Sequence, residues 1–514
     1  MPGSGVDMGG LDRAELAGKP AIVCGDRSET YAQLDTRTNR LAHALVEGGI
    51  GPLERVAVML PNGAEILEAG LAAAKAAAVV VPVNWHFKRD ELAWILIDSG
   101  AKILVTHASL LEEVLPALER APGCALVVVG AGDDDARDYE RVLTNAPDTR
   151  PERVGFETAE FFFYTSGTTG RPRGVERDPP RPGAPSMSRA LATMWGFTED
   201  DVWLAASPLY HAAGAYAFTE LHVGATVVVM ERWDAREWLR LVDEHRVTAT
   251  FMVPAHFIRV LEVPEEERRR YDTSSLRLIL HAAAPCPVAV KRAVLDAFPH
   301  VDVWEFYGAS EGGATRISAT EWREHEGSVG RPWPGTEVLV LDPDGEPVPP
   351  GDAGMIYVRS PHASRFRYHG DDAKTSQAWR DDAFTVGDIG YLDEDGFLYV
   401  TDRASDMVLR GGVNVYPAEI EQCLHDHPAV VDCAVFGVPD ERMGEELAAM
   451  VEVRAPVDAE ELRAHCRERL ASFKVPRDVT VVDALPRDPL GKIAKRRLRD
   501  AARAEHAERA GRAG

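Results

Sequence analysis

Five short segments of the sequence combine residue types that could bind a phosphate, a metal ion or a sugar hydroxyl. The first is Tyr164-Thr-Ser-Gly-Thr-Thr-Gly170, which continues to Gly174 and follows an aromatic run at residues 161–163. Its closely spaced Gly, Ser and Thr give a loop with accessible backbone N–H groups and hydroxyl donors, and such loops cradle phosphates. The spacing excludes a Walker A loop, because no Gly-Lys-Ser/Thr follows Gly167. The alternative is an ordinary flexible turn behind a strand.

The second segment, Glu305-Phe-Tyr-Gly-Ala-Ser-Glu-Gly312, follows a predicted strand and has two interpretations. In one, residues 308–312 form the GxSxG nucleophile elbow of an α/β-hydrolase, with Ser310 as nucleophile and Asp388 and a later His completing the triad. In the other, Glu311 is a Mg²⁺ ligand, because carboxylates are suitable hard ligands beside nucleotide phosphates. Tyr307 is then a platform on which a base stacks.

Three further segments follow towards the C-terminus. The third places Asp388 in a turn flanked by glycines, where a carboxylate could bind a ribose diol; the alternative is an Asx-type turn residue. The fourth, residues 410–421, is a Gly-rich hairpin that enters a helix at Pro417. The fifth, residues 485–495, places Lys492 on a loop that contains a glycine. Lysine is rare in this chain, with 9 lysines against 48 arginines, so each lysine raises the question of a role.

These segments need strands and helices to hold them in place. Apolar β-branched runs alternate with helical patterns through most of the chain. Strand, helix and strand in this order predict an α/β fold with right-handed crossovers and mostly parallel sheets. Asp234, with Glu237 three residues later, predicts a capped helix start. Strands are predicted at residues 225–230, 248–253, 276–281 and 301–306, and a helix at residues 287–298.

The chain is predicted to form two domains, at residues 1–402 and 403–514. After Asp402 the strand and helix patterns recur on a smaller scale, which indicates a separate small domain. Residues 176–188 hold four prolines and are predicted to be irregular, and residues 342–354 are predicted to be a turn-rich loop. In the small domain, strands are predicted at residues 430–436, 450–453 and 479–482, and a helix at Asp458 with Glu461.

The composition excludes several classes of protein. With 514 residues, of which 45% are hydrophobic and 27% charged, the chain resembles a soluble globular protein. Its net charge of −25 argues against a nucleic-acid backbone as the main partner. The 6 cysteines include no CxxC pair, which favours reduced thiols and a cytoplasmic protein. No signal peptide is expected at the start, and the longest apolar stretch, residues 69–83, is too short to span a membrane.

Taken in this order, the five segments resemble those of the adenylate-forming superfamily, which contains acyl-CoA synthetases, luciferases and the adenylation domains of peptide synthetases. The resemblance runs from Thr30 to Lys492, and residues 402–421 are most similar to AMP-forming fatty-acid and aryl-acid CoA ligases. It implies a large N-terminal adenylation domain for ATP and the acyl substrate, with a small mobile α+β C-terminal domain. The implied activity is that of an ATP-dependent, AMP-forming acid:CoA ligase that uses Mg²⁺. An acyl-adenylate and pyrophosphate form first, and CoA then displaces AMP.

By position in the motifs, the resemblance also implies a set of nucleotide-binding residues. The β- and γ-phosphates would be bound by Thr165, Ser166, Gly167, Thr168, Thr169 and Gly170, and the α-phosphate by Ser310. Mg²⁺ would be held by Glu311 and Thr165. Adenine would contact Ala283 and Tyr307, and the ribose hydroxyls would contact Asp388 and Arg403.

Four more residues would act on the acyl and thiol side of the reaction. Lys492 would bridge the substrate carboxylate and the α-phosphate, since a primary ammonium is a compact point charge on a flexible stem. His211, within residues 208–214, would gate the acyl site, and His281 would narrow or polarise it. Gly412 would lie in a hairpin that lines the pantetheine tunnel after the small domain rotates about a hinge near residues 403–406.

Two departures from the family's usual pattern bear on the substrate. Arg173 stands where Lys is usual, and residues 176–188 replace a helix start that contains a His. The acid could therefore be fatty, aryl, polycyclic or amino-aryl. The alternatives to CoA are a carrier-protein thiol supplied in trans, and nitrite activation for diazotisation of an amino-aryl acid in specialised metabolism. The alternative from another class of protein is a serine hydrolase that uses Ser310.

Overall fold

The fold consists of two compact units, each assembled from separate stretches of the chain. The first comprises Met1–Met252, Val263–Leu280 and Ser364–Thr375, and the second comprises Val253–Glu262, His281–Ala363 and Ser376–Gly514. The domain boundary after residue 402 stays a prediction. The computed structural model describes residues 7–132, 135–152, 155–165, 172–177, 186–360, 365–403, 406–410, 413–440, 443–487, 493–495 and 497–502.

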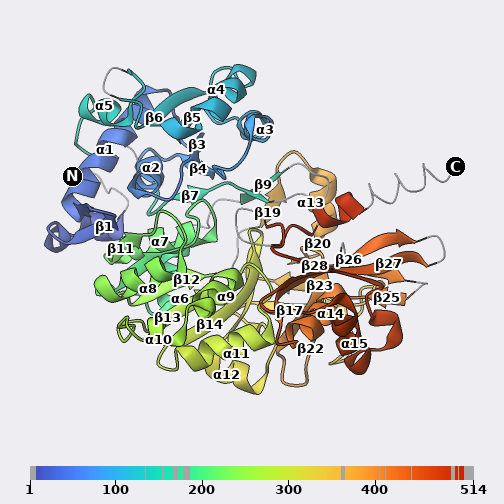
Figure 1. The fold of residues 1–514 in the computed structure, drawn as a ribbon. Coiled ribbons are helices and arrows are strands. Elements are labelled where there is room, and N and C mark those ends of the chain that lie inside the picture. The colour runs from blue at the N-terminus through green and yellow to red at the C-terminus, as the bar shows by residue number, and fades with distance from the viewer. Residues whose placement is uncertain are drawn as a thin grey trace. The chain divides into compact units, whose positions relative to one another are not determined.

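A sheet of parallel strands forms one half of the first unit (Figure 1). Its strand order is β6-β5-β3-β4-β7, and each neighbouring pair is parallel. The central strands are continuous apolar runs, as expected for strands that are covered on both faces. The elements are β3 (Arg55–Met59), β4 (Val79–Pro82), β5 (Ile103–His107), β6 (Ala125–Val129) and β7 (Glu160–Phe161), with helices α1 (Tyr31–Glu47), α2 (Ala64–Lys75), α3 (Arg89–Ser99), α4 (Leu111–Arg120) and α5 (Tyr139–Thr144).

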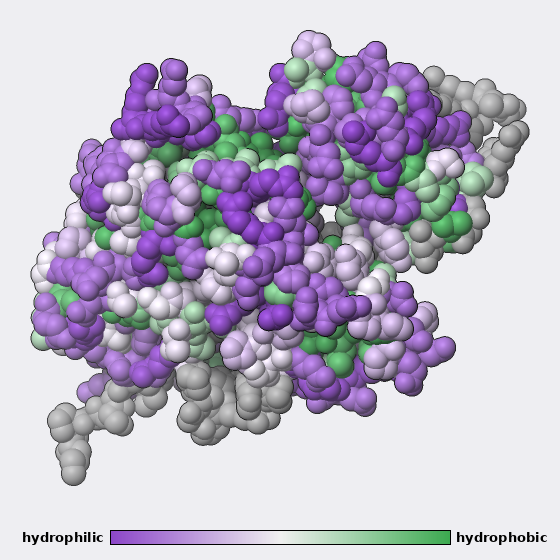
Figure 2. Space-filling model, turned by 90° about the horizontal axis from the view of Figure 1, so that it is seen from below, coloured by the Kyte–Doolittle hydropathy of each residue, from purple (hydrophilic) through white to green (hydrophobic). Residues whose placement is uncertain are grey.

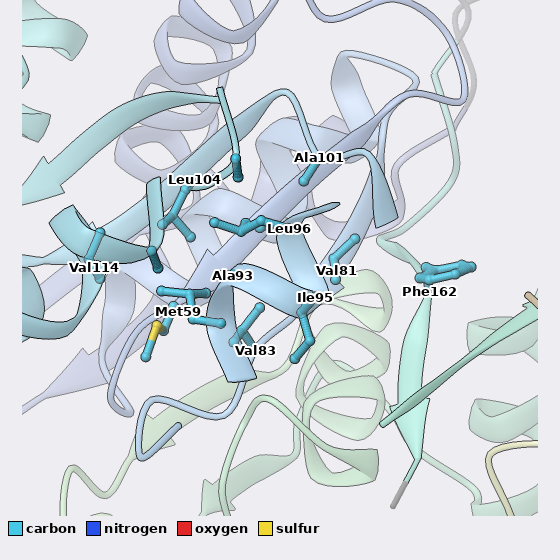
Figure 3. Close-up of a cluster of buried hydrophobic side chains, with 14 residues drawn as sticks. Met59, Val81, Val83, Ala93, Ile95, Leu96, Ala101, Leu104, Val114 and Phe162 are labelled. Carbon is cyan, nitrogen blue, oxygen red and sulfur yellow. The ribbon is translucent and has the colours of Figure 1, made fainter. Parts of the chain in front are cut away.

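The hydrophobic core of this half lies between the sheet and helices α3 and α4 (Figure 3). Met59, Val81 and Leu104 project from three neighbouring strands towards Ile95 and Leu96 of α3. Phe162 belongs to the same cluster and lies between β7 and β8. The core therefore fixes the strand that leads into the first predicted binding segment.

A second sheet of the first unit is also mostly parallel. The strands β10, β11 and β1 pair in parallel, and β12 joins β10 in parallel, whereas β1 and β2 are antiparallel. The side chain of Asp234 accepts hydrogen bonds from the backbone N–H groups of Arg236 and Glu237, so the predicted cap of α8 is confirmed. The elements are β1 (Pro20–Cys24), β2 (Arg27–Thr30), β10 (Val202–Ala205), β11 (Thr226–Val229), β12 (Ala249–Met252), β13 (Leu278–His281), α6 (Met187–Trp195), α7 (Ala212–Val223), α8 (Ala235–Glu244) and α10 (Glu265–Arg268).

A short antiparallel sheet completes the first unit and corrects one prediction. Its order is β19-β9-β8, from Phe366–Tyr368, Arg173–Arg177 and Phe163–Thr165. Residues 176–188 were expected to be irregular throughout, but Glu176 and Arg177 pair with Arg367 and Phe366 of β19. At the other end, α6 begins at Met187. The prediction is wrong at both ends. At the strand end, it is wrong because the strand partner comes from a distant part of the chain.

Antiparallel strands and several helices begin the second unit. The hairpin of β14 and β15 pairs with β16, and the antiparallel strands β20-β21-β18-β22-β23, with β17 beside β18, form another sheet. The turn-rich loop predicted at residues 342–354 is confirmed between β17 and β18. The elements are α9 (Pro254–Glu262), α11 (Val288–Ala297), β14 (Asp302–Ala309), β15 (Gly312–Ile317), α12 (Ala319–Glu324), β16 (Arg331–Pro332), β17 (Glu337–Leu341), β18 (Gly354–Arg359), β20 (Trp379–Arg380), β21 (Ala383–Phe384), β22 (Asp388–Leu392) and β23 (Leu398–Arg403); α13 (Asp372–Ala378) spans the point where the chain enters this unit again.

The C-terminal part of the second unit is a small α+β layer. Strands β25, β24, β27 and β26 are antiparallel, and β28 joins β27 in parallel. Leucines, valines and three cysteines from α14, α15 and these strands form its core. The elements are β24 (Val408–Arg410), β25 (Val413–Val415), α14 (Pro417–His425), β26 (Val430–Asp440), β27 (Gly444–Val453), α15 (Ala459–Arg469) and β28 (Asp478–Val482).

The surface and the helix lengths agree with the composition. The face seen in Figure 2 is mostly hydrophilic, with small hydrophobic areas scattered over it. In the part of the chain that the structure describes, none of the helices has the length and apolar character needed to cross a bilayer.

Lys75 at the end of α2 provides a test of the first unit. Its side chain is buried, and Nζ lies 2.6 Å from Oδ1 of Asp35, 2.8 Å from Oγ1 of Thr38 and 2.7 Å from Oδ1 of Asn39. Because Lys75→Met leaves these acceptors without their shared donor, we expect the free energy of unfolding to fall by about 2–4 kcal/mol. Urea unfolding should show no such loss for Lys102→Met, whose ion pair with Glu54 is half exposed. An unchanged midpoint for Lys75→Met would contradict the importance of this cluster.

Candidate functional site

The predicted phosphate-binding segment is the connection of a β-hairpin. Thr165 at the end of β8 is the register partner of Arg173 at the start of β9. The hydroxyl of Tyr164 donates to Oδ2 of Asp98 at 2.7 Å, and Nε1 of Trp94 donates to the carbonyl of Pro172 at 3.3 Å. Both ends of the connection are therefore held. The expected phosphate ligands Ser166, Gly167, Thr168, Thr169 and Gly170 lie outside the described residues.

Gly174, the last residue of this segment, is required by close packing. A Cβ atom there would lie 2.3 Å from Cζ of Phe162. The guanidinium of Arg55 covers the Phe162 ring at 4.0 Å and also pairs with Glu176 at 2.6 Å. Glu176, which departs from the family's usual pattern, is thus a residue of β9 that is held by an ion pair with Arg55.

His211 lies at the cap position of α7, within the segment expected to gate an acyl site. Its backbone is extended, and its ring lies 4.7 Å from the ring of Tyr210. A Cβ on Gly214 would lie 2.2 Å from the carbonyl oxygen of Leu209, so this tight turn requires glycine. The structure places His211 at the N-cap of α7, and Thr165 lies in the same unit.

Asn62 holds this segment and was missed by the sequence reasoning. Its Oδ1 accepts from the backbone N–H of Leu209 at 2.9 Å, and its Nδ2 donates to the carbonyls of Ser207 and Met230 at 3.2 and 3.1 Å. In the sequence it is an Asn between Pro61 and Gly63, which is typical of an ordinary turn. No local pattern could have shown that its amide binds strands about 150 residues away.

Ser310 and Glu311 form the two-residue turn between β14 and β15. Ala309 and Gly312 are register partners on either side of it, so the segment runs strand, turn, strand. A nucleophile elbow requires a strand, a turn and then a helix. The serine-hydrolase interpretation of Ser310 is therefore wrong, and the GxSxG pattern arises from a β-hairpin.

The structure brings Tyr307 and Asp388 together. The phenol hydroxyl of Tyr307 donates to Oδ2 of Asp388 at 2.6 Å, although 81 residues separate the two in the sequence. Asp388 is buried and is the register partner of Arg403, since β22 and β23 are antiparallel. Tyr307, expected at adenine, and Asp388, expected at the ribose, thus meet at one place in the second unit.

Small residues let aromatic rings approach this place. Tyr307, Gly308 and Ala309 line a small pocket together with Phe384. A Cβ on Gly312 would lie 2.7 Å from the Phe384 ring, so that position requires glycine. Ala283, expected on the other side of adenine, has a φ of 77°, a region that non-glycine residues rarely adopt. Unusual backbone of this kind persists where its surroundings determine it, and it is common at ligand sites.

Glu311 fits the chemistry of a magnesium ligand. Its side chain is 7% exposed and belongs to the turn expected at the α-phosphate. Among the described residues, no group of three or more His, Cys, Asp and Glu side chains could hold a metal ion. Mg²⁺ commonly takes one or two carboxylates and completes its shell with water and substrate phosphates. One carboxylate therefore suits a metal ion that arrives with ATP.

The segment expected to carry the catalytic lysine is anchored at both ends. Arg487 and Ile493 form an antiparallel bridge, and Nη2 of Arg487 lies 2.7 Å from Oδ2 of Asp432. Nζ of Lys495 lies 2.8 Å from Oε1 of Glu421, in the middle of α14. Lys492 and Gly412 themselves lie outside the described residues.

Asp402 connects the end of β23 to the small C-terminal layer. Its Oδ2 accepts from the backbone N–H of Ala418 at 3.1 Å, in the first turn of α14. A carboxylate at a helix N-terminus is favoured by the orphan N–H groups and the helix dipole. The residue just before the predicted hinge therefore binds the helix that follows the Gly-rich hairpin.

A tyrosine beside a buried carboxylate and an acidic turn between two strands agree with the family to which the chain is matched. Residues 12–366 match the family of AMP-binding enzymes, and residues 419–492 match the AMP-binding enzyme C-terminal domain. The chain belongs to the AMP-binding, adenylate-forming superfamily. It is an adenylate-forming ligase whose substrates are ATP and a carboxylic acid.

Known members of the superfamily resemble this chain along nearly its whole length. A feruloyl-CoA synthase of an Amycolatopsis species is 37% identical over 485 residues, which cover 93% of this chain and 95% of that protein. The fatty acid–[acyl-carrier-protein] ligase ScoC of Streptomyces coeruleorubidus is 34% identical, with 94% and 93% covered. The structure of the amide bond synthetase McbA of Marinactinospora thermotolerans has a TM-score of 0.82 and 29% identity, with 96% and 99% covered.

Tyr307→Phe tests the junction with Asp388. The variant removes one donor to a buried carboxylate, and such hydrogen bonds contribute about 1.5–3 kcal/mol. We expect the KM for ATP to rise about tenfold while the KM for the acid stays unchanged. Tyr391→Phe is the matched control, because Tyr391 lies on the same strand as Asp388 and its ring stacks on Tyr399. An ATP KM equal to that of the native enzyme would show that the phenol does not orient the carboxylate.

Proposed function

We propose that this protein is an AMP-forming carboxylic acid:CoA ligase and that its acid is an aryl acid of the ferulate type. The 37% identity to feruloyl-CoA synthases, which extends over 93% of the chain, carries the proposal. The Tyr307–Asp388 hydrogen bond and the Ser310–Glu311 turn support the proposal, because they would form part of the adenylation site that such a ligase needs.

The reaction has to overcome two obstacles. A carboxylate is a poor acyl donor, since it is anionic and its leaving group would be oxide. It must also approach the α-phosphate of ATP, so positive charge and hydrogen-bond donors have to be preorganised around both anions. A mixed anhydride with AMP then presents a good leaving group to a thiol. A bound Mg²⁺ would neutralise part of the phosphate charge.

The residues of this chain would divide this work. Tyr307 and Ala283 would hold adenine, and Asp388 and Arg403 would bind the ribose hydroxyls. Thr165 and the residues after it would donate to the β- and γ-phosphates, and Ser310 would donate to the α-phosphate.

Glu311 would hold Mg²⁺ together with Thr165, and Lys492 would place its ammonium between the two reacting anions. His211 would gate the acyl side. The Gly-rich hairpin with Gly412 would then line the path of the CoA thiol after the small domain, residues 403–514, has rotated.

The acceptor is the point on which the relatives differ. The names of the three proteins described above specify CoA, an acyl carrier protein and an amide bond. A carrier-protein thiol is the second candidate, because ScoC is 34% identical over nearly the whole chain. The adenylation residues would be the same for each acceptor.

Pyrophosphate release with and without an acceptor tests the proposal. We expect ferulate and related aryl acids to give about one pyrophosphate per chain without a thiol, as the adenylate accumulates, and multiple turnovers with CoA. The panel includes fatty acids, polycyclic acids and amino-aryl acids with nitrite, and a carrier protein bearing phosphopantetheine replaces CoA in parallel. Turnover with the carrier protein but not with CoA would replace the proposed acceptor, and no pyrophosphate with any acid would reject the function.

Lys492→Ala separates the two half-reactions. Loss of one preorganised donor to a developing anion costs about 10²–10³ in rate, and we expect adenylation to fall by at least this factor. Thioester formation from a synthetic acyl-adenylate and CoA should survive, because the lysine would act only in the first step. Lys88→Ala is the control, since that lysine is 73% exposed in the first unit. Near-normal adenylation by Lys492→Ala would refute the assignment.

A further inference from the structure

A buried ion pair lies in the second unit and has no part in the site described so far. Nζ of Lys291 lies 2.6 Å from Oε2 of Glu305 and 4.9 Å from the centre of the Trp322 ring. Lys291 is 0% exposed and Glu305 is 6% exposed. A buried ion pair adds little to stability, and its best-attested use is to fix one arrangement of the elements that carry it.

Lysine suits this place better than arginine. The chain uses arginine for most of its basic residues, yet α11 carries Lys291 here. An ammonium is a compact point charge, whereas a guanidinium is a planar fork that needs bidentate partners. One carboxylate oxygen and one aromatic face offer an ammonium the right partners.

His281 is the third member of the cluster. Its Nε2 lies 3.7 Å from Oε2 of Glu305, and its ring meets the edge of Phe257 at 5.0 Å between centres. Burial, together with the charge of Lys291, lowers the pKa of His281 well below its ordinary value. The imidazole is therefore neutral, and Lys291 supplies the positive charge opposite Glu305.

Each member of the cluster adjoins a part of the expected adenine site. His281 ends β13 and directly precedes residues 282–284, which contain the positive φ of Ala283. Lys291 lies on α11, the helix that follows this loop. Glu305 lies on β14 two residues before Tyr307, so the two side chains leave the strand on the same face. The ion pair thus connects β14, which carries Tyr307, to α11, the helix that follows the Ala283 loop.

We infer that Lys291 is a positioning residue for the nucleotide: its ion pair with Glu305 sets the separation between the Ala283 loop and Tyr307. The inference rests on the proposed function in one respect only, namely that adenine binds between these segments. A displacement of about 1 Å in such a site can lower the reaction rate about 10²-fold, even when the displaced residue touches no reacting atom.

The double variant K291M/E305M tests this inference. It replaces the ion pair by two unbranched apolar side chains of similar volume, a change that buried ion pairs often tolerate. We expect a folded protein with a melting temperature close to that of the native chain. The dissociation constant for ATP, measured by calorimetry without any acid, should rise about tenfold to hundredfold. If the double variant does not fold, E305Q answers the same question, because it keeps the shape of Glu305 and removes its charge.

Lys75→Met is the matched control. It also removes a buried lysine from an ion pair, but Lys75 lies in the first unit and its partner is Asp35. We expect this control to lose stability and to keep the ATP dissociation constant of the native chain. A general loss of stability would weaken ATP binding in both variants, whereas positioning weakens it in the Lys291 variant alone.

The inference and the proposed function fail in different measurements. Unchanged ATP affinity in a folded K291M/E305M or E305Q protein would overturn the positioning role, even if the native enzyme makes acyl-CoA. Absence of pyrophosphate release from the native enzyme would reject the ligase, while the ATP affinities of the variants would still be measured.

Discussion

The hydrogen bond between Tyr307 and Asp388 joins two sheets of the second unit. It spans 81 residues and connects the β14–β15 hairpin to the paired strands β22 and β23. Both residues lie on strands that are held by antiparallel pairing. The contact between them therefore needs little further ordering when a ligand binds. The tyrosine, the buried carboxylate and the hairpin that carries the acidic turn are thus held together within the second unit.

Three glycines permit close packing in segments that the sequence singled out. Gly312 permits the Phe384 ring, Gly174 permits the Phe162 ring, and Gly214 permits a tight approach to Leu209. In each case a Cβ would meet an atom at less than 3 Å, which close-packed interiors do not accommodate without displacement. These three glycines thus allow close packing against neighbouring side chains and backbone.

The sequence was sufficient for elements whose pattern is local. The apolar runs at residues 225–230 and 276–281 are confirmed as β11 and β13, and Asp234 caps α8 as expected. Patterns failed where a distant partner decided the outcome. Arg177 is in a strand because Phe366 pairs with it, and Ser310 is in a hairpin because Gly312 begins another strand. The interactions of Asn62 and the pairing of Lys291 with Glu305 depend on packing, which leaves no trace in the spacing of residues.

The acceptor poses a different problem, since the three relatives differ in it while aligning with at least 93% of this chain. Each of the acceptors attacks the same kind of activated acyl group, and any nucleophile that reaches the carbonyl completes the reaction. Adenylation therefore constrains the residues around ATP in every member, whereas the acceptor constrains only its own path to that carbon. The overall sequence identity between two members therefore reflects mainly the constraint that adenylation imposes on both. The acceptor has to be read from the residues along that path, and overall identity to a relative does not single them out.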